Sequence, residues 1–189
     1  MVKEPRAGRV KTRLARDLGL IRATWWYRHQ ALKTLRTLND PRWDTVLAVA
    51  PDREGVQSAF WPRHLPRIPQ GTGDLGQRMS RVMRQIGPRP TCLIGSDIPG
   101  IEKSHIVSAF ASLGTHSACI GPATDGGYWL IGLRHPTRQP AGFLGKVRWS
   151  TQWAKADTIA SAKSLNWAEL ETLSDIDTGA DYARWQARI

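Results

Sequence analysis

The sequence has few cysteines and no long apolar run. Only Cys92 and Cys119 occur among the 189 residues. Two thiols supply neither a disulfide framework nor the ligand spacing of a zinc site, so we expect buried free thiols of the kind that a reducing cytoplasm maintains. No apolar run approaches the roughly 20 residues that cross a bilayer. The chain also does not open on the segments of a secretory signal. These absences predict a cytoplasmic protein without a membrane partner.

Positive charge is abundant by contrast. The chain has 27 lysines and arginines against 16 aspartates and glutamates, a formal net charge of +11. Such an excess points to anionic partners such as nucleotides, phosphorylated metabolites, nucleic acid or an anionic surface, although solubility alone is the plainer interpretation. Nine tryptophans add some support for a basic nucleic-acid-binding module. These tryptophans are scattered, however, and no RNA- or DNA-binding signature occurs, so nucleic acid is the less favoured partner.

Short apolar runs alternate with helical patterns along the whole chain. This alternation predicts an α/β sandwich with a mostly parallel sheet, in one domain over residues 1–189. Ligands of such sheets bind at the carboxyl ends of the strands. Strands are expected at 45–51, 91–97, 117–123 and 128–133, and helices at 18–38, 73–87, 101–114, about 150–165 and from about 180 onward.

The stretch KEPRAGRVKTRLA, residues 3–15, gathers five cations around one glycine. Gly8 permits a positive φ angle or a close approach of the backbone to a ligand. Lys11 and Arg13 stand two residues apart before an expected helix, whose N-terminus adds partial positive charge. The GxxxxGK[ST] pattern of a P-loop is missing. The stretch therefore suits a chain of phosphates, and a merely solvated basic turn is the alternative.

Three aspartates are candidate ligands of a divalent cation. Asp97, in GSDIPG, stands at the carboxyl end of an expected buried strand. Asp175 and Asp177 alternate in SDIDTGADY, so an extended backbone turns both carboxylates to one side. Oxygen donors of this kind suit Mg²⁺ or Mn²⁺ together with substrate phosphates. Helix capping is the alternative, by Asp97 before the helix near residue 101 and by Asp177 or Thr178 before the last helix.

Two segments containing glycine are weaker signals. PQGTGDLGQRM, residues 69–79, places three glycines and Gln70 before a helix. The glycines permit a flat ligand to lie against the backbone, and the amide of Gln70 could read the edge of a base. DGGYWLIGL, residues 125–133, has two glycines before a strand. This second segment indicates either the close approach of a substrate or a plain hairpin turn.

Taken in order, six segments resemble the DUF2064 family, also described as selenodomain-associated transferase 1. They cover nearly the whole chain, from Lys3 to beyond Thr178, and although each is modest alone, six in register are specific. The resemblance implies the GT-A fold of the nucleotide-diphospho-sugar transferases. It also implies a more distant similarity to the guanylyltransferases that act on phospholactate or phosphoenolpyruvate in coenzyme F420 synthesis. The segments are KEPRAGRVKTRLA, PQGTGDLGQRM, LIGSDIPG, GPATDGGYWLIGL, WST at 149–151, and DIDT.

The resemblance also implies the roles of individual residues. Lys11, Arg13 and Asp97 would be the catalytic groups. The phosphates would lie on the loop that contains Gly8 and the two cations. The remaining roles would fall to Gln70, Gly71, Gly73 and Asp74 for base and ribose, to Asp97, Asp175 and Asp177 for the metal, and to Asp125, Gly127 and Trp149 for the acceptor.

These residues imply a Mg²⁺- or Mn²⁺-dependent transferase with a nucleotide or nucleotide-sugar donor and a small anionic acceptor. In nucleotidyl transfer the acceptor would attack the α-phosphorus and release pyrophosphate. In glycosyl transfer a nucleoside diphosphate would leave. No nucleophile–base pair is visible, which suits catalysis by positioning and charge neutralisation. A homologue that binds nucleotide without turnover is the other alternative.

The start of the chain departs from the pattern of the family. An apolar strand normally precedes the first lysine of the motif, but here only Met1 and Val2 precede Lys3. We therefore expect a truncated first strand. An open sheet edge invites pairing with another chain. We accordingly expect either a homodimer or poor order over residues 3–13.

Overall fold

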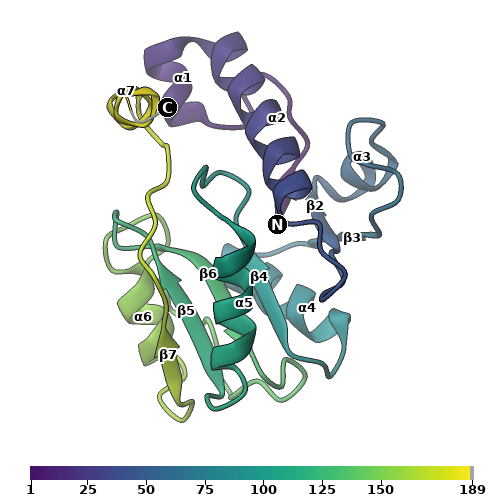
Figure 1. The fold of residues 1–189 in the computed structure, drawn as a ribbon, viewed down its shortest axis with the longest axis vertical. Coiled ribbons are helices and arrows are strands. Elements are labelled where there is room, and N and C mark those ends of the chain that lie inside the picture. The colour runs from purple at the N-terminus through teal and green to yellow at the C-terminus, as the bar shows by residue number, and fades with distance from the viewer. Residues whose placement is uncertain (188–189) are drawn as a thin grey trace. The chain divides into compact units, whose positions relative to one another are not determined.

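The computed structural model describes residues 1–187, which form two compact units (Figure 1). The first unit consists of residues 1–69, 96–101 and 174–187. The second consists of residues 70–95 and 102–173. Each unit has its own hydrogen-bonded sheet with helices beside it, so the α/β class expected from the sequence is confirmed.

The first unit contains a parallel sheet in the order β1-β2-β3. Its strands are β1 (Val2–Lys3), β2 (Leu47–Ala50) and β3 (Arg67–Pro69). Val2 lies opposite Val49, so the first strand is present over two residues and is paired with β2. The helices of this unit are α1 (Thr12–Leu18), α2 (Leu20–Thr37), α3 (Asp52–Gln57) and α7 (Gly179–Gln186).

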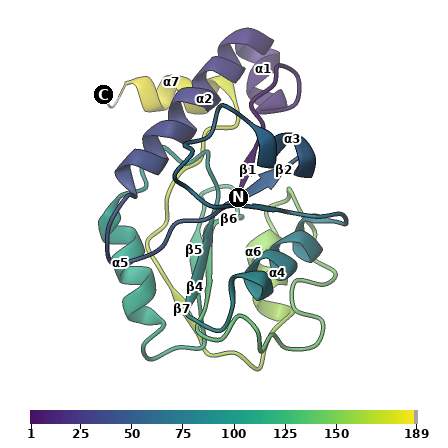
Figure 2. The same ribbon diagram turned by 90° about the vertical axis from the view of Figure 1, so that its right-hand side faces the viewer.

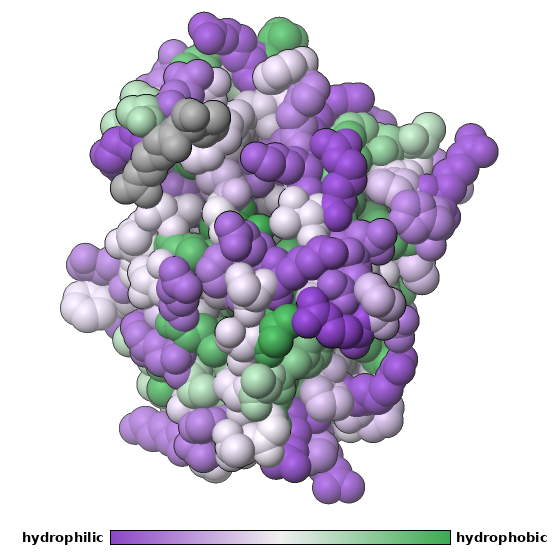
Figure 3. All heavy atoms as spheres, in the orientation of Figure 1, coloured by the Kyte–Doolittle hydropathy of each residue, from purple (hydrophilic) through white to green (hydrophobic). Residues whose placement is uncertain are grey.

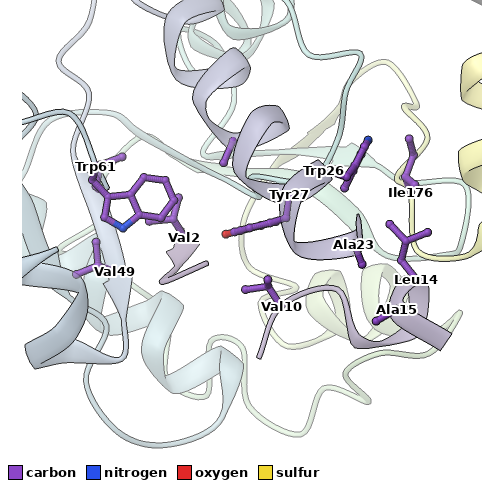
Figure 4. Packing of buried hydrophobic residues seen from close by; sticks show 12 residues of the cluster. Val2, Val10, Leu14, Ala15, Ala23, Trp26, Tyr27, Val49, Trp61 and Ile176 are labelled. Atoms are coloured by element: carbon purple, nitrogen blue, oxygen red, sulfur yellow. The ribbon is translucent and has the colours of Figure 1, made fainter. Parts of the chain in front are cut away.

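Buried apolar side chains join this sheet to its helices (Figure 4). Val2 and Val49 of the sheet belong to the same cluster as Trp26 of α2. Ile176, only 2% exposed, brings the segment before α7 into the cluster. Burying an aliphatic or aromatic side chain contributes roughly 1.5–3 kcal/mol. The burial of Ile176 therefore holds the neighbouring Asp177 at a defined place in the first unit.

The expected helix over residues 18–38 is found as α2 (Leu20–Thr37), and a separate helix α1 (Thr12–Leu18) precedes it. Gly19 separates α1 from α2 and has a φ angle of 83°. Only glycine adopts this conformation without steric cost, so the backbone turns there instead of continuing one helix. Residues 12–15 of the basic N-terminal stretch, which were expected in a loop, belong to the additional helix α1.

The second unit contains a mixed sheet in the order β4-β6-β5-β7. Strand β6 runs antiparallel to both β4 and β5, whereas β5 and β7 are parallel. Figure 2 shows α5 on one side of this sheet and α4 and α6 on the other. The elements are α4 (Leu75–Ile86), β4 (Thr91–Ile94), α5 (Lys103–Ser112), β5 (Ala118–Pro122), β6 (Tyr128–Leu133), α6 (Ala154–Ala160) and β7 (Trp167–Glu169).

Both cysteines lie opposite the same glycine of β6. Cys92 of β4 and Cys119 of β5 each pair with Gly132, and a Cβ atom on that glycine would lie 2.5 Å from the sulfur of Cys119. The thiols are free, but Cys92 is half-buried and not fully buried as expected. Their strands are two sheet spacings apart, roughly 9–10 Å, which exceeds the Cα separation that a disulfide spans. A hydrogen bond with Cys119, together with burial, raises the pKa of Cys92.

Most side chains on the face of the molecule seen in Figure 3 are hydrophilic. Within residues 1–187, the structure contains no helix with the length and apolar character that a membrane crossing requires.

Candidate functional site

Lys11 is the centre of a cluster of charged groups in the first unit. Its ammonium nitrogen lies 2.6 Å from the carbonyl oxygen of Ile176, 2.7 Å from Oδ1 of Asp177 and 2.9 Å from Oδ2 of Asp97. The side chain is only 4% exposed. Burial alone would lower the pKa of Lys11, but the charges and hydrogen bonds of the two aspartates raise it above its ordinary value.

The backbone at Lys11 has the left-handed conformation, with φ 47° and ψ 46°. This conformation costs a residue with a side chain roughly 1–2 kcal/mol. Lys11 stands at the N-cap of α1, and its nitrogen lies 5.7 Å from the centre of the Trp26 ring. The surrounding contacts thus hold a backbone conformation that an isolated lysine would avoid.

Arg13 and Asp177 extend this cluster toward solvent. Nη1 of Arg13 lies 3.3 Å from Oδ2 of Asp177, and the arginine side chain is 55% exposed. Thr178, next to Asp177, caps α7 together with Asp181. The helix-capping alternative is therefore right for Thr178, while Asp177 contacts the two cations.

Tyr27 links strand β1 to the loop that contains Asp97. Its hydroxyl accepts a hydrogen bond from the backbone N–H of Lys3 at 3.0 Å and lies 3.1 Å from Oγ of Ser96. Burial raises the pKa of Tyr27, so the hydroxyl keeps its proton at neutral pH. Sequence reasoning missed this tyrosine, because it lies within a helical pattern 24 residues from Lys3.

Two other cations of the basic stretch share a different acidic partner. Arg6 and Arg9 lie 3.1 Å and 4.0 Å from Oε2 of Glu54 in α3. Gly8 lies between them in an exposed turn with a φ angle of 77°. The expected positive φ of Gly8 is confirmed. The five cations do not form one cluster, because four of them pair with Glu54, Asp97 or Asp177 and Lys3 is exposed.

The aspartates expected to bind metal are only partly brought together. Asp97 and Asp177 share the ammonium of Lys11. In the part of the chain that the structure describes, no three acidic, histidine or cysteine side chains form a group able to hold a metal ion, so Asp175 does not complete such a group. The oxygen donors around Lys11 are nevertheless of the kind that Mg²⁺ and Mn²⁺ prefer, and the ammonium stands among them as a cation supplied by the chain.

The loop over residues 70–74 belongs to the second unit and leads into α4. Arg81 stabilises this loop, because its Nη1 donates hydrogen bonds to the carbonyl oxygens of Gln70 and Thr72, both at 2.9 Å. Gln70 is 3% exposed, and its amide oxygen accepts a hydrogen bond from Arg78 at 3.0 Å. That oxygen is therefore already engaged within the protein.

Two glycines and Asp74 shape the rest of the loop. Gly71 and Gly73 have φ angles of 76° and 103°. A Cβ atom on Gly71 would lie 2.3 Å from Nη1 of Arg81, so only glycine lets the arginine reach the loop. Asp74 caps α4 and accepts a hydrogen bond from the backbone N–H of Gln77 at 2.8 Å. The conformation of the loop and the capping of α4 therefore account for the presence of Gly71, Gly73 and Asp74 at these positions.

The residues expected at the acceptor also lie in the second unit. Oδ1 of Asp125 accepts a hydrogen bond from the N–H of Gly127 at 2.8 Å, which closes the turn before β6. Trp149 is half-buried, with its ring centre 6.4 Å from that of Tyr128. A Cβ atom on Gly76 would lie 2.9 Å from the indole of Trp149. Trp149 thus contacts the first turn of α4, directly after the loop over residues 70–74.

Comparison with solved structures supports the expected fold. A crystal structure from Desulfovibrio desulfuricans G20, of a protein provisionally named a nucleotide-diphospho-sugar transferase, is similar with a TM-score of 0.79 and 31% sequence identity. The match covers 94% of this chain and 80% of that one. A homologue of a Mycobacterium tuberculosis protein, from Mycobacterium sp. strain JC1, has a TM-score of 0.54 at 14% identity over 86% of this chain and 82% of its own. The second likeness shows the fold alone.

Comparison with curated proteins found no match. The model of the family described as "Uncharacterized protein conserved in bacteria (DUF2064)" matches residues 34–151, which is more than half of the chain. The resemblance read from the six sequence segments is therefore confirmed. The chain belongs to the DUF2064 family, within the superfamily of nucleotide-diphospho-sugar transferase folds.

Proposed function

We propose that this protein is a transferase that uses a nucleotide or a nucleotide-sugar as donor and a small anionic molecule as acceptor. The observation that carries the proposal is the cluster of Lys11, Arg13, Asp97 and Asp177 in a chain of this fold. A buried cation between carboxylates, with an exposed arginine beside it, can neutralise phosphate charge and position a divalent cation.

We assign the phosphates to Arg13 and Lys11. Arg13 is exposed and has guanidinium N–H groups beyond the one that faces Asp177, so it can donate to phosphate oxygens in the present conformation. Gly8 gives the preceding turn a backbone without a side chain. We retain the loop of Gln70, Gly71, Gly73 and Asp74 for base and ribose as part of the proposal.

We assign the acceptor to Asp125, Gly127 and Trp149, as the resemblance implies. Trp149 offers a half-buried aromatic face against which an acceptor can pack. Arg148, the preceding residue, is exposed, and its guanidinium is paired with the carboxylate of Asp157 at 2.8 Å. Asp125 supports the turn in which Gly127 lies.

A divalent cation, Mg²⁺ or Mn²⁺, would be held by Asp97 and Asp177, with Asp175 as a further candidate. When bound, it would supply Lewis-acid stabilisation of charge on the phosphates. The protein's own cations would orient the phosphates for attack by the acceptor. Nucleotidyl transfer and glycosyl transfer both fit this arrangement, because each needs charge neutralisation more than proton transfer.

A thermal-shift panel tests the proposal. Nucleoside triphosphates and nucleotide-sugars are added separately, each with and without Mg²⁺, and the melting temperature is recorded. A ligand at about 100 times its Kd stabilises the folded state by roughly 2.7 kcal/mol, so binding produces a clear upward shift. The proposal is overturned if no nucleotide raises the melting temperature while a polynucleotide binds with steep salt dependence.

A further inference from the structure

The ammonium of Lys11 has no hydrogen-bond donor left for a ligand. A protonated lysine has three N–H donors. The nitrogen has three oxygen neighbours at 2.6–2.9 Å, on Ile176, Asp177 and Asp97. Each donor can therefore be used by an acceptor of the protein. In this conformation Lys11 cannot also donate to a phosphate, which is the role that the basic stretch suggests.

The three acceptors form a site that suits a cation other than an ammonium. Two carboxylate oxygens and one backbone carbonyl oxygen are hard donors of the kind that divalent cations take. The carboxylates of Asp97 and Asp177 are 40% and 32% exposed, so a hydrated ion can reach them from solvent. Lys11, at 4% exposure, occupies the protected side of the same oxygens.

The charges of the cluster also balance in two different ways. In the present conformation the two carboxylates are neutralised by Lys11 and Arg13. A divalent cation at the carboxylates would neutralise them alone, and both side-chain cations would then be unpaired. Unpaired cations beside bound metal are what a polyphosphate requires, because it carries several negative charges of its own.

We propose that Lys11 is an exchangeable internal cation, which holds the carboxylates together until a divalent ion replaces it. Replacement frees its three donors for phosphate. Binding of the divalent ion and binding of phosphate at Lys11 therefore reinforce each other, and by thermodynamic reciprocity each raises the affinity for the other. This inference rests on the proposed function for its phosphate ligand, whereas the exchange itself requires only the metal.

The exchange is tested with Mn²⁺ alone, by titration calorimetry and without nucleotide. Lys11→Met keeps the length of the side chain but removes the competing charge, so this variant should bind Mn²⁺ at least about tenfold more tightly than the natural chain. Lys11→Arg keeps the charge and should stay near the natural affinity. Lys33→Met removes an exposed charge on α2 and controls for the change in net charge. Equal affinity of Lys11→Met, Lys33→Met and the natural chain would overturn the proposal.

A second measurement uses the natural chain and does not depend on the folding of a variant. Reductive methylation is followed at each lysine by peptide mass spectrometry, with and without saturating Mg²⁺. Lys11 should react slowly without the ion, because it is buried and paired, and several times faster with it. Lys33 should react at one rate in both conditions. An unchanged rate at Lys11 under saturating Mg²⁺ would contradict the exchange, even if the nucleotide panel confirms the proposed function.

Discussion

The ammonium of Lys11 lies 2.7 Å from Oδ1 of Asp177, although 166 positions separate the two residues. This contact joins the N-cap of α1 to the residue just before the N-cap of α7, within the first unit. Helices α1 and α7 are also joined by Asp17, whose carboxylate accepts a hydrogen bond from the N–H of Gly179 at 2.7 Å. The two chain ends of the first unit are thus held together by ionic and hydrogen-bonded contacts.

The contact between Lys11 and Asp177 should be measurable as a coupling free energy. Lys11→Met and Asp177→Asn should each lower the free energy of unfolding by about 1–3 kcal/mol, because each leaves a charged or polar partner unsatisfied. The double variant should lose less than the sum of the two single losses. Urea denaturation of the four proteins measures the difference, with Lys33→Met as a control that changes stability by less than about 0.5 kcal/mol. Strict additivity would show that the contact does not stabilise the fold.

The hydroxyl of Tyr27 should support the short strand β1. Tyr27→Phe removes the acceptor for the Lys3 N–H and the contact with Ser96, so we expect a loss of about 1–2 kcal/mol in the free energy of unfolding. Tyr182→Phe is a matched control, since its exposed hydroxyl accepts only a hydrogen bond from Gln186 among the contacts described here. Denaturant unfolding compares the two variants. Equal losses for the two variants would contradict a stabilising role of the Tyr27 hydroxyl at β1.

Arg81 should be a positioning residue for the loop over residues 70–74. Arg81→Met removes both hydrogen bonds to the loop carbonyls. If this loop holds base and ribose, the variant should bind nucleoside and triphosphate more weakly by the same factor. Arg84→Met removes an exposed arginine of the same helix and should change neither affinity. Calorimetric titration gives both values, and a loss confined to the triphosphate would assign Arg81 to phosphate binding instead.

The ion pair of Arg148 and Asp157 should make the second unit sensitive to acid. Hydrogen bonds from the side chain and the backbone of Arg148 lower the pKa of Asp157 to about 2. Because the folded-state pKa is depressed, the stabilisation is present above the ordinary carboxyl range near pH 4 and is lost as the pH falls toward 2. The melting temperature of the natural chain should therefore fall more steeply than that of Asp157→Asn between pH 4 and 2. Parallel curves would contradict this.

The strands that the sequence predicted well are those with distinct apolar runs. Strand β6 was expected at 128–133 and is found there, and β5 was expected within one residue of its bounds at each end. The elements that were missed are short: α1, α3, β3 and β7. A strand of three residues shows no measurable alternation, so its pairing is decided by tertiary contacts and not by its own sequence.

The candidate site was predictable as a set of residues but not as an arrangement. The motifs indicated Lys11, Asp97 and Asp177 as charged functional groups. They could not show that the carbonyl of Ile176 completes the surroundings of Lys11, because a backbone oxygen has no signature in sequence. One signal was present in the alternation of Asp175, Ile176 and Asp177. In an extended segment neighbouring side chains point to opposite sides, so a buried Ile176 turns both aspartates away from the core.

The central claim, that the first unit binds the phosphates of a nucleotide, is tested most directly at Arg13. Titration calorimetry is carried out with the triphosphate that raises the melting temperature most, and with its nucleoside. Arg13→Ala should weaken binding of the triphosphate by about 1–3 kcal/mol and leave the nucleoside unchanged, because only the triphosphate loses a charge-assisted hydrogen bond. Arg16→Ala, an exposed arginine of the same helix, should behave like the natural chain. If Arg13→Ala binds the triphosphate as tightly as the natural chain, or weakens the nucleoside equally, the phosphates do not lie on this cluster.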